Sequence, residues 1–497
     1  MEGWQKELAK SGLWVLSISH SIRILAFVST IILARLLSPS DFGIVAMATA
    51  VVTLVEMLGD FGFHVYLVQK QDLKDEDLNT AWTFQLVFAL LEACALTVCA
   101  PFIARLYQEP RLSPVFYALA ASITVGGFRN IGIVTFQKEL KFQREFFLRV
   151  PSKILGVGAS LASAFAMRSH WALIVGILAQ RLTEVAASYL LSSFRPGFSL
   201  RGTKELFRFS KWLYWNTTLS FLLQRSPDLI LGKIAGKNAV GLFSVSHSLA
   251  TLPTSELADP IARATFPSYV KLRNDRSLLG EGYVKVLSLM SFVAIPMGVG
   301  LVALADILVP VLLGAQWASA APLLKILGVA GILKTLQSNT GSIFLAQGRP
   351  QAVTALLILR VVVLVPMLIV LSSRAHAVGA AWAYLAGEAM IAPMVFGYVF
   401  NLLELKWMNA MRIFLRPCVA SLVMVLALNG TMASSMISGL AERSFGVLTI
   451  LVFVGFITYL CVAFGLWVVC GKENSTPESW IVGLLRRFSN IRFGVGS

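Results

Sequence analysis

Charged residues recur inside stretches of this sequence that are otherwise apolar. A charge at the centre of a transmembrane helix costs about 2.5–3.5 kcal/mol on the insertion scale, so such residues should face water, a partner or a ligand rather than lipid. The basic members of this set are Arg23, Arg129, Lys153, Arg181, Arg225, Arg263, Lys325, Lys334 and Arg360. The acidic members are Glu56, Asp60, Glu92, Glu184, Asp228, Glu256, Asp259 and Glu388. These residue types favour binding of a charged ligand or movement of an ion.

Spacing places several of these residues on shared helix faces. Glu56, Asp60 and His64 occupy positions i, i+4 and i+8, so a continuous helix would present them on one face. Arg225 and Asp228 are one helical turn apart. A further set with helical spacing is Glu256, Asp259 and Arg263. His64, beside Asp60, is the histidine most suited to proton coupling.

A group of cations around a cavity suits a phosphate or pyrophosphate, because arginine binds such oxygens in bidentate geometry. The candidate substrate-binding residues are Arg23, Arg129, Arg225, Arg263, Lys334 and Arg360. The candidate residues for H⁺ or Na⁺ coupling are Glu56, Asp60, Asp228, Glu256 and Asp259. The alternative is that these charges only pair with one another and hold helices together.

Neither a metal site nor a catalytic centre is indicated. The five cysteines and five histidines lack metal-ligand spacing, and no phosphate-binding loop is present. A net charge of +16 could suggest nucleic acid in a soluble protein, but no basic–aromatic module accompanies it. We therefore expect no metal, no organic cofactor and no nucleic-acid partner.

The elements that carry these charges are predicted to be membrane-spanning helices. The 497 residues are 57% hydrophobic and 14% charged, with a mean hydropathy of +0.74, whereas soluble domains have about 25% charged residues. Apolar segments of roughly 20 residues, each long enough to cross a bilayer, recur about fourteen times. They lie near 13–35, 40–66, 80–106, 112–137, 146–167, 170–194, 211–235, 239–270, 283–313, 318–346, 350–372, 376–403, 413–434 and 445–470. The predicted class is an all-α polytopic membrane protein with about 14 transmembrane helices.

The basic residues of the connections indicate an orientation. With the N-terminus in the cytoplasm, most of the Lys and Arg outside the spans fall on the cytoplasmic side, and the opposite orientation inverts that bias. Both termini are therefore predicted to be cytoplasmic.

Two stretches resemble each other without a gap. Residues 32–47 read ILARLLSPSDFGIVAM, and residues 230–245 read ILGKIAGKNAVGLFSV, at an offset of 198 residues. The matched positions are Ile32 with Ile230, Leu33 with Leu231, Arg35 with Lys233 and Gly43 with Gly241. A weaker echo pairs the span of Arg129 with that of Lys334. If the match is not chance, it predicts two six-helix lobes in the same orientation, with two extra helices.

The predicted domains follow from this repeat. They are an N-terminal lobe at 1–200, a C-terminal lobe at 201–410, and two extra helices with a basic cytoplasmic tail at 411–497.

A series of short motifs connects these features to a known family. In chain order they are ARLLSPSDFGIVAM, DFGF, VQKQDLKDEDLNTAW, GIVTFQKELKF, DLILGKIAG, GLFSVSHSLATLP, LLGAQWASAAPLLKIL and FLAQGRP. Together they resemble the polysaccharide transporters, or Wzx-like oligosaccharide flippases, of the multidrug/oligosaccharidyl-lipid/polysaccharide exporter superfamily, over about residues 10–430.

That resemblance implies a MATE-like fold of two lobes around a cavity. It implies movement of an undecaprenyl-pyrophosphate-linked repeat unit of an exopolysaccharide, capsule or O-antigen across the bacterial inner membrane. Partners would be this anionic lipid-linked oligosaccharide, membrane lipids, and the glycan polymerase and glycosyltransferases of the same pathway. Related lipid II flippases use cavity arginines on early helices of each lobe, and Arg23 and Arg225 match these best by position.

Two other functions are compatible with a polytopic chain. A MATE-type multidrug exporter would favour an acidic cavity for cationic drugs, and the basic set opposes it. A membrane glycan polymerase or transferase would be expected to carry catalytic groups in a sizeable extracytoplasmic loop, but the outer connections are short. A transporter rather than an enzyme is therefore expected.

Overall fold

The computed structural model describes residues 2–59, 62–201, 203–252, 259–433, 444–469 and 477–479. Within these residues every regular element is a helix. Ten of the described helices are long and apolar enough to cross a membrane, or eleven if a pair bent by 66° is one span. The prediction of an all-α, multi-pass membrane protein is confirmed, whereas the count of fourteen spans stays a prediction.

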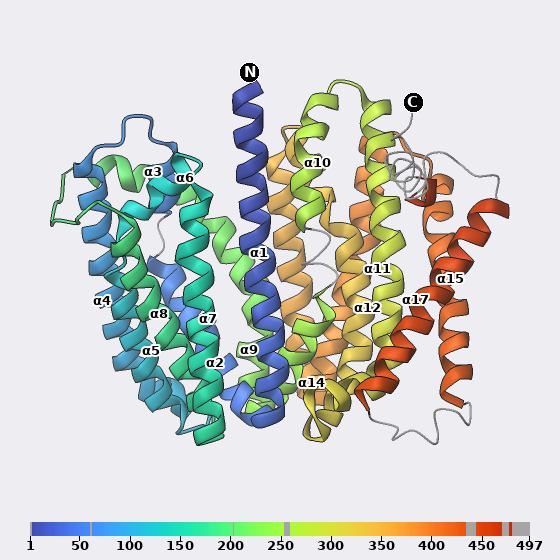
Figure 1. Cartoon of the computed structure of the whole chain (residues 1–497), viewed down its shortest axis with the longest axis horizontal. Helices are drawn as coiled ribbons and strands as arrows, with labels where there is room; N and C mark the ends of the chain where they lie inside the picture. Colours follow the sequence, from blue (N-terminus) through green and yellow to red (C-terminus); the bar gives the residue numbers. More distant parts are fainter. Residues whose placement is uncertain are drawn as a thin grey trace, which may run out of the picture. The chain divides into compact units, whose positions relative to one another are not determined.

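Packing divides the chain into two compact units, Met1–Ser244 and Val245–Ser497, called Unit 1 and Unit 2 below. The lobe boundaries predicted from the repeat stay predictions. In Unit 1 the long helices α4, α5, α7 and α8 run alongside one another (Figure 1). The helices of Unit 1 are α1 (Glu2–Leu36), α2 (Pro39–Gly59), α3 (Phe63–Gln69), α4 (Asp75–Leu106), α5 (Leu112–Gly127), η1 (Ile131–Ile133), α6 (Val134–Lys138), α7 (Phe142–Met167), α8 (Trp171–Leu191) and most of α9 (Thr203–Ala250).

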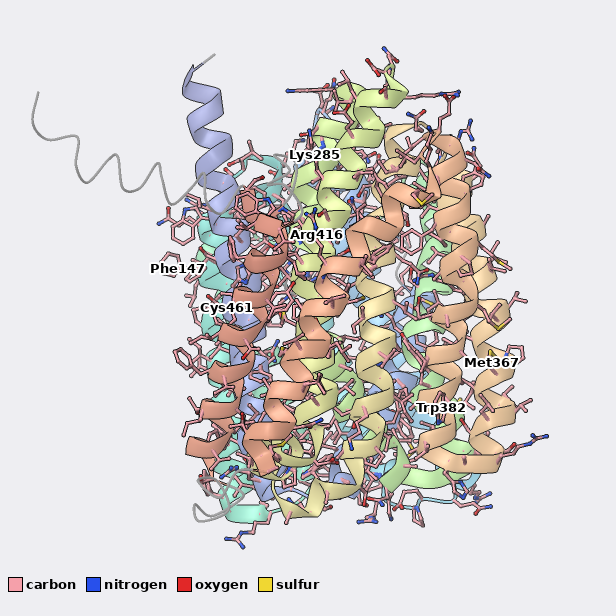
Figure 2. The ribbon with its side chains drawn as sticks, turned by 90° about the vertical axis from the view of Figure 1, so that its right-hand side faces the viewer. Phe147, Lys285, Met367, Trp382, Arg416 and Cys461 are labelled. Atoms are coloured by element: carbon pink, nitrogen blue, oxygen red, sulfur yellow. The ribbon has the colours of Figure 1, made fainter. Side chains whose placement is uncertain are left out.

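Unit 2 contains the end of α9 and the remaining helices. These are α10 (Asp259–Leu272), α11 (Arg276–Leu313), η3 (Ala315–Ala320), α12 (Ala321–Ser338), α13 (Thr340–Ala346), α14 (Pro350–Leu402), α15 (Trp407–Ala433) and α17 (Phe445–Val469). Trp382 of α14 and Cys461 of α17 lie on the outer surface of this unit (Figure 2), and Trp382 is 51% exposed. Large apolar surfaces of this kind mark contact with a membrane.

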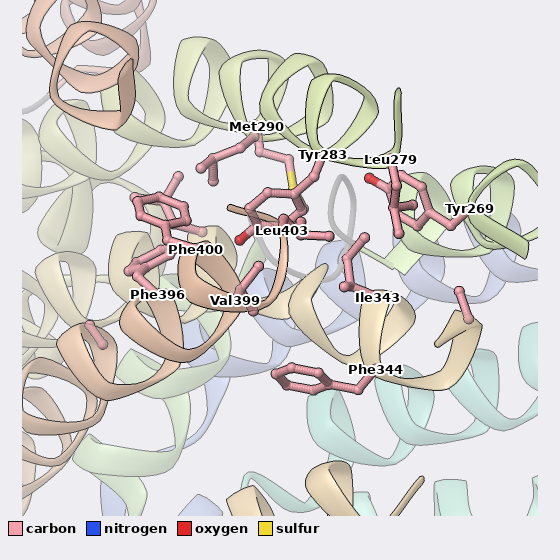
Figure 3. Packing of buried hydrophobic residues seen from close by; sticks show 14 residues of the cluster. Tyr269, Leu279, Tyr283, Met290, Ile343, Phe344, Phe396, Val399, Phe400 and Leu403 are labelled. Carbon is pink, nitrogen blue, oxygen red and sulfur yellow. The ribbon is translucent and has the colours of Figure 1, made fainter. Parts of the chain in front are cut away.

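The core of Unit 2 includes a cluster where α10, α11, α13 and α14 meet. Tyr283, Leu279 and Ile343 are fully buried in it, and Phe396 and Phe400 of α14 close one side (Figure 3). This packing holds α14 against α11, and α14 carries charged residues of the site described below.

Two helices are too long to be single spans. The 53 residues of α14 would extend about 80 Å as one straight helix, against a hydrocarbon core of about 30 Å. The helix is interrupted at Ala375 and His376, where His376 has a φ of 49°. Likewise α9 is interrupted at Gly236, whose φ of 75° suits glycine. Both breaks fall between segments predicted as separate spans.

Three segments predicted as unbroken spans are divided instead. The segment 40–66 divides into α2 and α3, 112–137 into α5, η1 and α6, and 239–270 into the end of α9 and α10. The segment 318–346, by contrast, lies within one candidate span, Ala315–Ala346. At the second break the Asn130 side chain accepts a hydrogen bond from the Gly132 amide at 2.9 Å and donates one to the Phe194 carbonyl at 2.7 Å. The first of these bonds is local to the turn, whereas the second reaches a residue 64 positions along the chain, which hydropathy does not reveal.

The sequence repeat is visible as a symmetric contact within Unit 1. A Cβ atom on Gly43 would lie 1.7 Å from the Lys237 carbonyl oxygen, and one on Gly241 would lie 1.8 Å from that of Pro39. Gly43 and Gly241 are repeat partners, and Pro39 and Lys237 are separated by the same offset of 198 residues. Two backbones can approach this closely only where neither has a side chain. The contact therefore gives the matched glycines a physical reason.

Candidate functional site: charged networks in the two units

Unit 1 encloses a cavity of about 300 Å³ between α2, α3, α4, α5 and α8. The charged and titratable side chains of its lining are Glu56, His64, Glu92, Arg129 and Arg181. Candidate residues for substrate binding (Arg129) and for ion coupling (Glu56) thus lie in one cavity.

Each arginine of this cavity is paired with a glutamate. The Arg181 Nη2 atom lies 2.7 Å from Glu56 Oε1, and the Arg129 Nη1 atom lies 2.9 Å from Glu184 Oε1. The Arg129 and Glu184 side chains are 37% and 17% exposed, so this pair contributes about 1 kcal/mol or less to stability. Both arginines are therefore paired in this structure, and the roles of Arg129 in substrate binding and of Glu56 in ion coupling stay predictions.

The break after α5 positions Arg129. The Gln85 side chain of α4 donates hydrogen bonds to the carbonyls of Gly127 at 2.9 Å and Arg129 at 2.8 Å. These carbonyls end a helix and have no partner within it, so the glutamine satisfies them. The guanidinium of Arg129 is thereby held where α8 presents Glu184.

His64 begins a polar chain that leaves the cavity. Its Nε2 atom lies 2.9 Å from Gln137 Oε1 of α6, and the Gln137 amide donates to Glu145 of α7 at 3.2 Å. Glu145 is in turn paired with Arg149 at 2.9 Å. The predicted single stripe of Glu56, Asp60 and His64 is interrupted, because α2 ends at Gly59, yet Glu56 and His64 line the same cavity. Asp60 lies outside the described residues.

The remaining Unit 1 candidates lie on α1 and α9. Arg225 and Asp228 are within 3.6 Å of each other, as their spacing of one turn predicts, and the Asp228 side chain is buried. Arg23 is half-buried on α1.

The candidates near residue 260 belong to Unit 2. Glu256 lies outside the described residues, as do the side chains of Asp259 and Arg263 in α10.

At the end of Unit 1 where α1 turns into α2, ionic contacts hold α9 in place. Glu109 is bound by Lys237 and, at 2.8 Å, by Arg111, while Lys233 donates to the Leu106 carbonyl at 2.8 Å. Burial alone would raise the pKa of Glu109, but the hydrogen bonds from Arg111 and Lys237 hold it below its usual value. Glu109 therefore stays ionised and can hold both cations.

Unit 2 contains a different network on α12 and α14. The Lys334 Nζ atom lies 3.3 Å from the Tyr384 hydroxyl oxygen and 5.6 Å from the centre of that ring. Arg360 lies 3.5 Å from Glu388 and donates to Gln337 at 3.2 Å. Within the described part of the chain, Lys334 makes no ion pair. Tyr384 and Gln337 were missed from sequence because neither is charged, although Tyr384 precedes Glu388 by one turn.

A groove of about 500 Å³ lies between α11, α15 and α17 of Unit 2. Its lining side chains are apolar except for Tyr459, whose hydroxyl already donates to the Phe292 carbonyl at 2.6 Å. Among the described residues that line it, the groove therefore offers a ligand no free hydrogen-bonding side chain.

Comparisons with known proteins connect this arrangement to a family. Residues 32–322 match the model of a family described as polysaccharide biosynthesis proteins. The chain belongs to this family. It is 24% identical over 369 residues to the lipopolysaccharide biosynthesis protein WzxC of Escherichia coli (strain K12), covering 73% of this chain and 74% of WzxC.

Solved structures show the same fold. The lipid II flippase MurJ in an inward closed conformation aligns with a TM-score of 0.74 at 14% identity, over 92% of this chain and 99% of MurJ. An inward-facing MATE multidrug transporter of the MOP superfamily aligns with a TM-score of 0.60 at 16% identity, over 79% of this chain and 98% of that one. The expected MATE-like fold is confirmed, and so is the resemblance to the polysaccharide transporters of this superfamily.

Proposed function

We propose that this polysaccharide biosynthesis protein is a flippase for an anionic, lipid-linked oligosaccharide. The cargo would be an undecaprenyl-pyrophosphate-linked repeat unit of an exopolysaccharide, capsule or O-antigen, moved across the bacterial inner membrane by alternating access. Both termini would be cytoplasmic. The observation that carries the proposal is the apolar groove of Unit 2, about 500 Å³ in volume, in a membrane protein of this family.

The groove suits a hydrocarbon chain better than a sugar. A sugar buried there would leave its hydroxyls without partners, and each unsatisfied polar group costs about 1–3 kcal/mol. An isoprenoid chain makes no such demand and gains about 25 cal/mol for each Å² removed from water. Free sugars or nucleotide sugars are therefore poor candidates for the cargo.

The charged networks favour an anionic head group. Glu56 of the Unit 1 cavity is paired with Arg181, and Glu184 is paired with Arg129 of the cavity lining, so neither of these two glutamates is open to a cationic drug. In Unit 2, Lys334 contacts a neutral hydroxyl and keeps its charge available. The same pairing leaves these glutamates poorly placed as a catalytic acid and base, which supports transport rather than an enzymatic function.

Ion coupling remains part of the proposal. Protonation of Glu56 or Asp228 would release Arg181 or Arg225 from its partner, and binding of Na⁺ would compete for the same carboxylates. Asp60, Glu256 and Asp259 would join them. The polymerase and glycosyltransferases of the same pathway would supply and consume the cargo.

The test is a flipping assay with two glycine variants of α17. A fluorescent undecaprenyl-pyrophosphate oligosaccharide would be reconstituted with the purified chain in liposomes, and the fraction reaching the second leaflet measured. Gly455 lines the groove, where an added Cβ would lie 3.5 Å from Leu428, so Gly455→Phe should fill it and reduce flipping at least tenfold. Gly465 on the same helix has open space beside it, so Gly465→Phe serves as the matched control.

Each result bears on the proposal. Flipping by the unsubstituted chain and by Gly465→Phe, together with loss in Gly455→Phe, would support it. No flipping by the unsubstituted chain, with transport of a cationic dye instead, would favour the multidrug exporter. An Arg23→Gln/Arg225→Gln double variant that folds and flips normally would remove those two residues from the substrate site.

A further inference from the structure

A second cavity of Unit 1, separate from the one lined by Glu56, has a volume of about 200 Å³. It lies between α1, α2, α7 and α8, and Lys153 and Ser160 of α7 both line it. The charged residue of its lining is Lys153, and among the described residues that line it there is no carboxylate.

Lys153 is a cation that lies deep along α7, and few neighbouring groups stabilise its charge. It lies eleven residues after the first residue of α7, or about 17 Å along the helix axis, and so near the middle of this 26-residue helix rather than at a span end. Its Nζ atom has Gln180 Oε1 of α8 at 3.4 Å, a long contact with a neutral group. Across the chain as described, Lys153 forms no ion pair. An isolated charge in such surroundings is costly unless a partner binds it.

Ser160 is the second unsatisfied group of this cavity. Its side chain belongs to a residue only 5% exposed, and its Oγ atom has no hydrogen-bond partner among the described residues. Ser160 follows Lys153 by seven residues, which places both on one face of α7. Gly176 of α8 packs directly against Ser160. A Cβ atom on residue 176 would lie 2.6 Å from the Ser160 Cβ, so only glycine leaves room for the serine at this position.

The chemistry of these two groups defines the missing ligand. An ammonium can only donate hydrogen bonds, and the serine hydroxyl has its proton to donate, so the ligand must accept. Their positions on α7 are about 10 Å apart along the axis, which requires at least two acceptor oxygens. A cavity of about 200 Å³ is smaller than the 300–1,000 Å³ typical of pockets for whole drug-sized ligands. The ligand is therefore a compact oxyanion, with sugars and lipid chain remaining outside.

We propose that the Lys153 pocket binds the phosphate oxygens of the polyprenyl pyrophosphate carrier. Lysine is a common phosphate ligand that acts as a point charge, and Ser160 adds a hydrogen bond to a second oxygen. This assignment rests on the proposed function, because the carrier is the cargo of the flippase.

The test measures binding to the purified full-length chain in nanodiscs. The probes are undecaprenyl pyrophosphate and inorganic pyrophosphate, and the readout is the dissociation constant. Lys153→Met should weaken binding of undecaprenyl pyrophosphate at least tenfold, and Ser160→Ala should weaken it about threefold to fivefold. Lys325→Met is the matched control, since Lys325 is paired with Asp306 at 2.6 Å outside this pocket, and it should bind like the unsubstituted chain.

The outcomes separate this assignment from the proposed function. If the unsubstituted chain binds the lipid and Lys153→Met binds it equally well, the pocket assignment is wrong while the flippase proposal stands. If the unsubstituted chain neither binds nor flips the lipid, the proposed function fails first. Tight binding of inorganic pyrophosphate without binding of the lipid would show a free-anion site and overturn the assignment. If Lys153→Met does not fold, Lys153→Gln and the charge-keeping Lys153→Arg replace it, and only the arginine should retain binding.

Discussion

Arg129 in Unit 1 and Lys334 in Unit 2 are a pair that the sequence repeat relates, yet their surroundings differ. Arg129 and Lys334 are 205 residues apart, and the acidic residues Glu184 and Glu388 are 204 residues apart. By this correspondence each cation should have a glutamate partner. Arg129 does, at 2.9 Å from Glu184, whereas Lys334 contacts the Tyr384 hydroxyl instead.

In Unit 2 a second cation, Arg360, lies close to the same glutamate. Arg360, on α14 before its break, reaches Glu388 at 3.5 Å and Gln337 at 3.2 Å. Arg360 rather than Lys334 is thus the ion-pair partner of Glu388. In this structure Arg129 is paired with a carboxylate and Lys334 makes no ion pair among the described residues, and binding of a ligand by either cation stays a prediction.

The largest expected effect is on transport by Lys334→Met. Removing a charged hydrogen-bonding group from a ligand costs about 1.5–3 kcal/mol, which corresponds to roughly a tenfold to hundredfold loss. We expect at least a tenfold decrease in flipping for Lys334→Met and less than threefold for Arg129→Met, measured in the liposome assay. Lys334→Arg should retain most activity. Equal losses in the two methionine variants would remove the distinction between bracing and available cations.

The second effect is on stability and concerns Glu388→Gln. Its carboxylate is 9% exposed and its removal leaves Arg360 buried without a charge partner, so a loss of about 3 kcal/mol is expected. Unfolding by SDS titration in mixed micelles measures this change. A double variant, Arg360→Gln with Glu388→Gln, should recover part of the loss. A loss below about 1 kcal/mol in the single variant would show that this pair is more hydrated than its burial indicates.

The matching change in Unit 1, Glu184→Gln, should cost less. Because the Arg129 side chain is 37% exposed, water can solvate it after its partner is removed, and a loss of about 1 kcal/mol or less is expected. The same SDS titration compares it directly with Glu388→Gln. A loss as large as that of Glu388→Gln would mean that the two networks are equally buried.

The smallest effect is expected for Tyr384→Phe. The hydroxyl lies 3.3 Å from Lys334, a long hydrogen bond, while the ring remains in place to face the ammonium. A stability loss of about 0.5 kcal/mol is expected, at the low end for a hydrogen bond. If flipping also falls more than tenfold, the hydroxyl orients Lys334 toward the cargo, and its role is larger than the geometry of this state indicates.

Much of the fold was predictable because it depends on local composition. Apolar segments of sufficient length had to be helices, since a helix satisfies its own backbone in lipid. The break in α14 at His376 and that in α9 at Gly236 fell between predicted spans. The breaks between α2 and α3 and between α5 and η1 were not predicted, although glycines and charged or polar residues interrupt the apolar run at both places. At Asn130 one of the hydrogen bonds of the turn reaches Phe194, which is distant along the chain.

The candidate site was predictable as a set of charges and not as a set of partners. Only Arg225 with Asp228 was paired correctly from spacing, since both lie on one helix. The partners of Arg129, Arg181 and Arg360 are 55, 125 and 28 residues away, and sequence distance carries no information about which carboxylate reaches which cation. Lys153 is absent from the predicted substrate-binding set for the same reason, because the start of α7 decides its depth and the residues packed around it decide that no described carboxylate reaches it.

By itself, then, the sequence determined a helical membrane protein with a repeated plan and more interior cations than lipid alone would tolerate. Hydropathy and charge are properties of single residues and short segments, so they can be read locally. Only the tertiary structure decided which cations are neutralised, that Gly43 and Gly241 touch, and that an apolar groove accompanies the charges. Those features depend on contacts between helices distant in sequence, whose packing is settled by the whole chain.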